Sequence, residues 1–222
     1  MMDHVIYTPK GAAREYSPLA ANLYRGCAHG CKYCYVPGIF RQSREAFASG
    51  PRPRPGVLDQ LAKDAKRLAA RGEKGPVLLC FTSDPYQPCE EEHEVTQDAM
   101  EILVNQGLGV RLLTKNPRLA IERDLEVLVW DDVEFGVSLS WIDDKRRQEW
   151  EPYAGTVDDR IWSLAEAKSA GLRTWVSIEP VIAWHLGASQ EGARQILDEA
   201  EVMLRTAAGI RFPDLCVNGG GR

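Results

Sequence analysis

The chain has 222 residues, of which 44% are hydrophobic and 27% charged, and its formal net charge at neutral pH is −5. This composition predicts one globular domain spanning residues 1–222, and the negative charge disfavours a broadly basic nucleic-acid surface while leaving room for a local one. No apolar run approaches the ~20 residues that span a bilayer. The six cysteines, three of them crowded into one short stretch, indicate metal chemistry in a reducing, cytoplasmic compartment rather than a secreted disulfide scaffold.

Apolar strands alternate with amphipathic helices after an N-terminal segment (residues 1–19) that we expect to lie against the domain. Strands are expected at 20–24, 77–82, 110–114, 133–140 and 174–178, with a weak edge strand near 210–217. Helices are expected near 58–69, 95–107, 117–128, 161–172 and 193–204. Residues 218–222 are expected to form a disordered tail.

This alternation predicts an α/β fold with parallel strands and right-handed crossovers. About six βα units fit the chain, fewer than the eight that close a full barrel. We therefore expect a partial (β/α)6 TIM-like barrel over residues 20–217, and an open doubly wound sheet is the alternative. Arginines alternate with prolines between residues 50 and 56, which predicts an extended, solvated connection, with contact to an anionic substrate as the alternative.

Three cysteines follow the first predicted strand at the spacing C-x3-C-x2-C: Cys27, Cys31 and Cys34. Thiolates so close in sequence can reach one metal centre together. Because structural zinc takes four ligands and a self-contained iron–sulfur cluster takes four cysteines, three cysteines favour a cubane cluster with one iron open to a non-protein ligand. The alternatives are zinc with His29 as fourth ligand, in a non-enzymatic metal- or nucleic-acid-binding module, or partial disulfides, or ordinary thiols.

Polar side chains cluster where the predicted strands end, and in parallel α/β folds these ends gather at one rim of the sheet. The residues concerned are Ser83, Asp84, Lys115, Ser138, Ser140 and Glu179. Their structural alternatives are a helix cap for Ser83 and Asp84, a solvated charge for Lys115, and an ion pair with an arginine for Glu179.

The cysteine spacing, with Tyr33 directly before the last cysteine, resembles the cluster loop of radical S-adenosylmethionine (SAM) enzymes. Over residues 20–182 the sequence is similar to the branch of the family that contains spore photoproduct lyase. The resemblance implies a partial barrel, a [4Fe–4S] cluster on Cys27, Cys31 and Cys34, and SAM on the open iron. It further implies that an electron donor such as flavodoxin or ferredoxin drives cleavage of SAM to methionine and a 5′-deoxyadenosyl radical, which abstracts hydrogen from an unidentified substrate.

The same resemblance implies roles for individual residues. The implied cofactor-binding set is Tyr33, Ser83, Asp84, Lys115, Ser138, Ser140 and Glu179. Within it, Ser83 and Lys115 match residues that contact the methionine part of SAM, and a cation such as Lys115 suits a carboxylate. Tyr33 is expected beside the adenine, Ser138 or Ser140 near the ribose, and Glu179 near the adenosyl part. Tyr35 resembles an aromatic residue of a hydrogen relay and is the candidate catalytic residue.

The chain departs from the lyase at one position of that relay. A cysteine directly before the Thr-Ser-Asp triplet returns a hydrogen atom in the lyase, and Phe81 occupies that place here. Cys80 is adjacent, but the alternation of side chains on a strand predicts that it points away from the site unless the strand bulges. We therefore expect a substrate other than spore photoproduct.

Overall fold

The computed structural model describes residues 4–11, 13–180, 198 and 215–216. The predicted tail at 218–222 and nearly all of the predicted helix at 193–204 lie outside the described residues. None of the helices in this part of the chain is long and apolar enough to cross a membrane.

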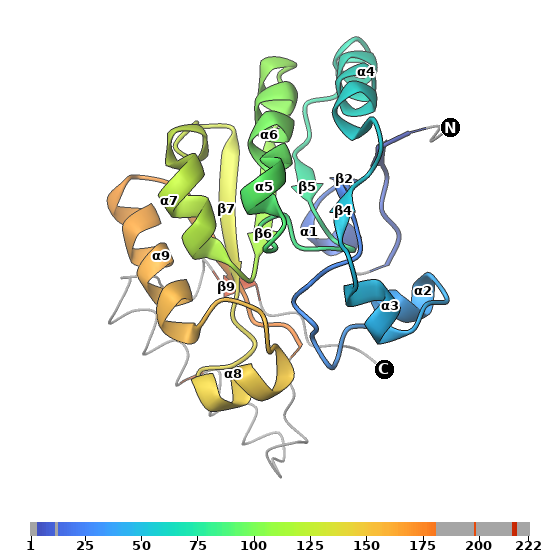
Figure 1. Cartoon of the computed structure of the whole chain (residues 1–222). Helices are drawn as coiled ribbons and strands as arrows, with labels where there is room; N and C mark the ends of the chain where they lie inside the picture. The colour runs from blue at the N-terminus through green and yellow to red at the C-terminus, as the bar shows by residue number, and fades with distance from the viewer. Residues whose placement is uncertain (1–3, 12, 181–197, 199–214, 217–222) are drawn as a thin grey trace.

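A seven-stranded sheet forms the centre of the fold (Figure 1). In spatial order its strands are β1 (Ile6–Tyr7), β2 (Leu19–Ala21), β5 (Val77–Leu79), β6 (Val110–Thr114), β7 (Val133–Ser138), β8 (Arg173–Ser177) and β9 (Leu215–Cys216). β1 is antiparallel to β2, and every other neighbouring pair is parallel. Val77 lies opposite Val110, which in turn lies opposite Val133, so the carboxyl ends of these strands meet at one edge.

Four long helices connect these strands: α4 (Val57–Ala69), α6 (Val95–Asn105), α7 (Pro117–Leu128) and α9 (Val157–Ser169). Each contacts the next in a single row (Figure 1). The strand order from β2 to β8 advances in one direction, so right-handed crossovers place these helices on one face of the sheet. This confirms the predicted α/β class with mostly parallel strands, whereas a doubly wound sheet would carry helices on both faces. In the described residues, β1 and β9 are the two sheet edges and do not pair with each other.

The local sequence explains where these helices begin. Pro117 occupies the first turn of α7, where its missing N–H costs nothing. Thr156 caps α9 through a reciprocal capping box with Asp159. The inward faces of the helices and strands then form one apolar core, whose fully buried members include Leu61, Leu79, Leu112, Phe135 and Leu164.

Shorter elements complete the described part: α1 (Ala13–Tyr16), β3 (Tyr24–Arg25), α2 (Val36–Ile39), α3 (Arg44–Ala48), β4 (Arg52–Pro53), α5 (Glu90–His93) and α8 (Asp144–Trp150). β3 and β4 pair in a separate antiparallel sheet, with Tyr24 opposite Pro53. The proline–arginine stretch is therefore extended, as predicted, but it is not simply solvated. The Arg54 N–H donates to the Leu23 carbonyl at 2.9 Å, and this strand pair holds the segment that carries the cysteines.

Gly136 on β7 is expected to tolerate no side chain. A Cβ atom there would lie 2.3 Å from the Trp175 ring and 2.5 Å from the Leu112 carbonyl oxygen. Overpacking of this kind costs about 1–3 kcal/mol or more, so Gly136→Ala should lower the free energy of unfolding by at least that amount in a urea titration. Gly38→Ala is the matched control, because a Cβ at Gly38 meets nothing within 4 Å. Equal stability of the two variants would contradict the packing described for β7.

Candidate active site

A cavity of about 330 Å³ opens at the carboxyl edge of the sheet, beside the cysteine loop (residues 26–35). Its wall contains ten of the eleven predicted site residues, namely Cys27, Cys31, Tyr33, Cys34, Tyr35, Ser83, Asp84, Lys115, Ser138 and Glu179. Ser140 is the exception. Its hydroxyl donates to the Glu179 carbonyl and lies 3.3 Å from the Tyr33 hydroxyl, so it supports the wall from behind.

The cysteine loop is held by backbone contacts on several sides. The Cys27 N–H donates to the Phe47 carbonyl at 3.2 Å, and the Lys32 N–H donates to the Trp150 carbonyl at 2.9 Å. The Arg44 guanidinium donates to the carbonyls of Cys31 at 3.2 Å and Cys34 at 2.9 Å. Gly26 has φ +79°, and a Cβ there would lie 2.6 Å from the Phe47 oxygen, so the turn into the loop requires glycine. The loop conformation is thus fixed by the protein itself.

The three thiols suit a cluster better than a single zinc ion. Each cysteine is half-buried and faces the cavity, and no three His, Cys, Asp or Glu residues within the described ranges are arranged to share one metal ion. In a cubane, by contrast, each cysteine binds a different iron. Of the His29 ring nitrogens, Nδ1 lies 3.1 Å from the Tyr153 carbonyl oxygen, and Nε2 faces the Asp84 carboxylate at 3.2 Å without a hydrogen bond of good geometry.

The electrostatics of the thiols agree with a cationic metal centre. Burial, assisted by the charge of Asp84, raises the pKa of Cys27 far above its usual value, and burial raises the pKa of Cys31 to about 12. The surrounding protein therefore does not stabilise free thiolates. A bound metal centre supplies the positive charge that favours their deprotonated form.

Asp84 joins three parts of the site. Its carboxylate accepts hydrogen bonds from the Thr114 hydroxyl at 2.6 Å, the Lys115 N–H at 2.7 Å and the Tyr86 N–H at 2.9 Å. Burial alone would raise the pKa of Asp84, but His29 and these donors lower it to about 2. Asp84 thus braces the cysteine loop against the ends of β5 and β6, and most of its lone pairs already have protein partners.

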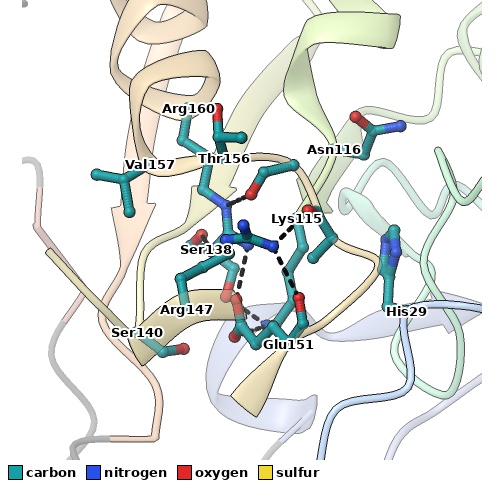
Figure 2. A network of polar contacts seen from close by, with 12 residues as sticks. His29, Lys115, Asn116, Ser138, Ser140, Arg147, Glu151, Thr156, Val157 and Arg160 are labelled. Atoms are coloured by element: carbon teal, nitrogen blue, oxygen red, sulfur yellow. Dashed lines mark hydrogen bonds and ion pairs between the residues drawn. The ribbon is translucent and has the colours of Figure 1, made fainter. Parts of the chain in front are cut away.

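Lys115 is held over the cavity by a buried polar network (Figure 2). Its ammonium donates to the Ser138 hydroxyl at 2.6 Å, lies 3.9 Å from the Glu151 carboxylate and sits 5.8 Å from the centre of the Tyr33 ring. Glu151 is fully buried and accepts a 2.7 Å hydrogen bond from Arg160, also fully buried, and another from the Tyr33 hydroxyl. Burial opposes ionisation of Glu151, but Arg160 and Lys115 prevail and its pKa is lowered. The network fixes one cation in the pocket wall.

Glu179 is positioned by the N-terminal segment rather than by an arginine. The Tyr16 hydroxyl donates to the Glu179 carboxylate and lies 2.9 Å from the Ser177 hydroxyl, while the Tyr16 ring packs against Phe81 and Trp175. Burial raises the pKa of Glu179. No arginine among the described residues forms an ion pair with it.

Sequence reasoning missed three residues of this site: Tyr16, Glu151 and Arg160. Tyr16 comes from the N-terminal segment, which shows no regular pattern and gave no signal. Glu151 and Arg160 lie in the region whose sequence is similar to the lyase branch, and this similarity could have indicated them. Neither residue was assigned a role because both lie outside the strand ends.

The orientation expected for Cys80 stays a prediction, because Cys80 is one of the residues that line the cavity while its thiol is bonded to a buried backbone N–H. β5 ends at Leu79, so the alternation of a strand does not extend to Cys80. The thiol accepts a hydrogen bond from the Leu23 N–H at 3.3 Å, and Cys80 lines the cavity next to Phe81. Burial raises the pKa of Cys80 to about 12, so it is a neutral thiol in the pocket wall.

The structure thus combines a mostly parallel sheet, a three-cysteine loop and a cavity at the carboxyl ends of the strands, which is where functional sites lie in folds of this kind. The family model of the Radical SAM superfamily matches residues 21–182, well over half of the sequence. The chain belongs to this superfamily, whose members use a [4Fe–4S] cluster and SAM as cofactors.

Individual relatives agree with this assignment. A solved structure of spore photoproduct lyase complexed with dinucleoside spore photoproduct is similar, with a TM-score of 0.71 and 20% identity over 97% of this chain and 58% of that chain. An uncharacterized protein of Acidianus two-tailed virus is 27% identical over 77% of this chain and 58% of its own length. A radical SAM Nalpha-GlyT isomerase of Pseudomonas phage M6 is 29% identical over 70% of this chain and 31% of its own length. The chain thus spans roughly three fifths or less of these relatives.

Proposed function

We propose that this chain binds a [4Fe–4S] cluster through Cys27, Cys31 and Cys34 and binds SAM in the adjoining cavity. When bound, these cofactors supply an electron and a 5′-deoxyadenosyl radical that abstracts hydrogen from a substrate. The observation that carries the proposal is the convergence of three thiols, a fixed cation and several hydroxyls on one cavity at the strand ends. The residues of the chain orient SAM and exclude water around it.

The polar groups of the wall suit the methionine part of SAM. The Lys115 ammonium is positioned to pair with its carboxylate. The Ser83 hydroxyl is buried and has no partner of good hydrogen-bonding geometry among the described residues, which supports a role as acceptor for the ammonium of SAM. Asp84 acts as a positioning residue, because its oxygens already hold the Lys115 N–H and His29.

The part of the cavity wall that adjoins Lys115 suits the adenosyl part of SAM. Tyr33, Ser138 and Glu179 line it, and Ser140 acts through Tyr33 and the Glu179 carbonyl. Tyr35 lies nearer the opening, with 55% of its surface exposed and its ring 6.4 Å from that of Phe81. We assign Tyr35 to the substrate side, where a relay hydroxyl would stand.

Replacing Lys115 by Ala is expected to weaken SAM binding by about tenfold or more, because a charge-assisted hydrogen bond contributes ~1.5–3 kcal/mol. The measurement is the SAM dissociation constant of anaerobically reconstituted protein by calorimetry. Lys145→Ala removes an exposed lysine of α8 and serves as the control. An unchanged dissociation constant in the Lys115 variant would refute the role.

The first substrate to test is the dinucleoside spore photoproduct held by the lyase structures. The expectation of a different substrate stays a prediction, and this compound tests it directly because Cys80 and Phe81 both line the cavity. Conversion of this compound by wild type, lost in Cys80→Ala, would support lyase-type repair. No conversion by a protein that cleaves SAM would point to another substrate.

A further inference from the structure

Positive charge is concentrated around the cysteine loop of an otherwise acidic chain. Between residues 22 and 56 the chain has six basic residues and one acidic residue, Glu45, so this segment has a net charge of +5 while the rest of the chain has −10. The basic residues are Arg25, Lys32, Arg41, Arg44, Arg52 and Arg54. A separation of charge this strong produces a local positive potential that attracts anionic partners.

Four of these arginines remain exposed and form no ion pair with a carboxylate in the described part of the chain: Arg25, Arg41, Arg44 and Arg52. Arg25 and Arg52 are directly opposite each other in the β3–β4 pair, an arrangement of like charges that destabilises a sheet. Arg41 follows α2 with φ +53°, a conformation that favours glycine. Packing of the chain itself gives no reason for this arrangement.

Two apolar side chains are exposed among these arginines. Ile39 and Phe40 have 59% and 52% of their surface exposed, and the Phe40 ring stacks on Phe47 of α3 at a centroid distance of 6.4 Å. α2 and α3 lie together at one corner of the molecule, and β4 follows α3 along the chain (Figure 1). We call Arg25, Ile39, Phe40, Arg41, Arg44 and Arg52 the arginine face. Exposed aromatic and apolar side chains together with arginine are typical of protein–protein interfaces.

The arginine face is also in direct contact with the cysteine loop. The Arg44 side chain, exposed on one side, donates to the carbonyls of Cys31 and Cys34 on the other. A partner that docks here therefore lies one side chain away from the backbone of two proposed cluster ligands. No other exposed arginine or lysine in the described residues donates a hydrogen bond to this loop.

We propose that the arginine face docks an acidic one-electron carrier protein that reduces the cluster. This inference rests on the proposed function. The carrier loses one electron and the cluster gains one, with no bond made or broken. A protein carrier is favoured over a nucleic acid because of the exposed apolar side chains and the contact with the cysteine loop.

The test compares two reductants on reconstituted holoenzyme. The variant replaces Arg25, Arg41 and Arg52 by Glu, and the control replaces Lys63, Lys66 and Arg71 by Glu, which are exposed on or just after α4 and change the net charge equally. Cluster bleaching is followed by stopped flow with fully reduced flavodoxin, which is acidic, and separately with dithionite, which needs no docking. Ile39→Asp is a second variant that leaves the arginines intact.

With flavodoxin at low ionic strength, we expect the arginine variant to be reduced at least tenfold more slowly than wild type and the control to differ little, and we expect the gap to narrow with added salt. With dithionite, all proteins should be reduced alike. Titration of oxidised flavodoxin against each protein should show weaker binding to the arginine variant than to wild type and the control. This binding measurement does not depend on whether SAM is cleaved.

Equal rates for the arginine variant, the control and wild type with flavodoxin, together with equal binding, would overturn the proposal. So would a variant that reduces and binds normally but loses affinity for a single-stranded oligonucleotide, because that face would then bind nucleic acid. If wild type binds flavodoxin through these arginines but dithionite reduces no cluster, the proposed function fails while the docking face stands.

Discussion

Cys31→Ala is expected to abolish both cluster assembly and the cleavage of SAM. Cys31 lines the cavity and is the middle cysteine of the three in sequence. Without it, a cluster bound by only two cysteines has two irons that lack a protein ligand. We expect the iron content after anaerobic reconstitution to fall from about four per chain to near zero. The same protein should form no 5′-deoxyadenosine above background.

Cys89→Ala is the matched control for this variant. Cys89 is also half-buried, but it precedes α5 and does not line the cavity. It should retain the full iron content and wild-type SAM cleavage. A Cys31→Ala protein that still produces 5′-deoxyadenosine from SAM would contradict the assignment of the cysteine loop.

Glu151→Ala is expected to cause the largest loss of stability among single changes in the polar network. Removing one partner of a fully buried ion pair leaves the other charge uncompensated, at a cost of about 3–5 kcal/mol. Here the abandoned group is Arg160, which is 0% exposed, and the Tyr33 hydroxyl loses its acceptor as well. Urea unfolding of the cofactor-free protein measures the change directly.

Two comparisons isolate this effect. Glu122→Ala breaks the exposed pair between Glu122 and Arg118, and it should cost no more than ~1 kcal/mol. The double variant Glu151→Ala/Arg160→Met removes both charges and should recover part of the lost stability, because an apolar replacement of a buried pair is often tolerated. A Glu151→Ala protein as stable as Glu122→Ala would show that the network does not hold the pocket wall.

The regular part of the fold was predictable because its signals are local. The strand Val110–Thr114 and the start of α7 at Pro117 lie where the sequence pattern places them. The polar strand ends were predictable for the same reason, since parallel strands bring their carboxyl ends to one edge. Ten predicted site residues accordingly share one cavity.

The remaining features depend on contacts between distant residues. Tyr16 reaches Glu179 across 163 positions of sequence, and Tyr33 of the cysteine loop reaches Glu151 across 118. β5 ends at Leu79, three residues before the predicted end of this strand at residue 82. Pro53 can pair within β4 because a two-residue strand at the surface demands few N–H donors.

We propose above that this chain uses a cluster bound by three cysteines to cleave SAM. The most direct test is to reconstitute the protein anaerobically, reduce it with dithionite, add SAM and quantify 5′-deoxyadenosine and methionine. We expect a brown protein that forms 5′-deoxyadenosine and methionine in equal amounts, and we expect neither product from Cys31→Ala. A colourless protein that retains zinc through reconstitution, or a fully loaded protein that forms neither product, would contradict it.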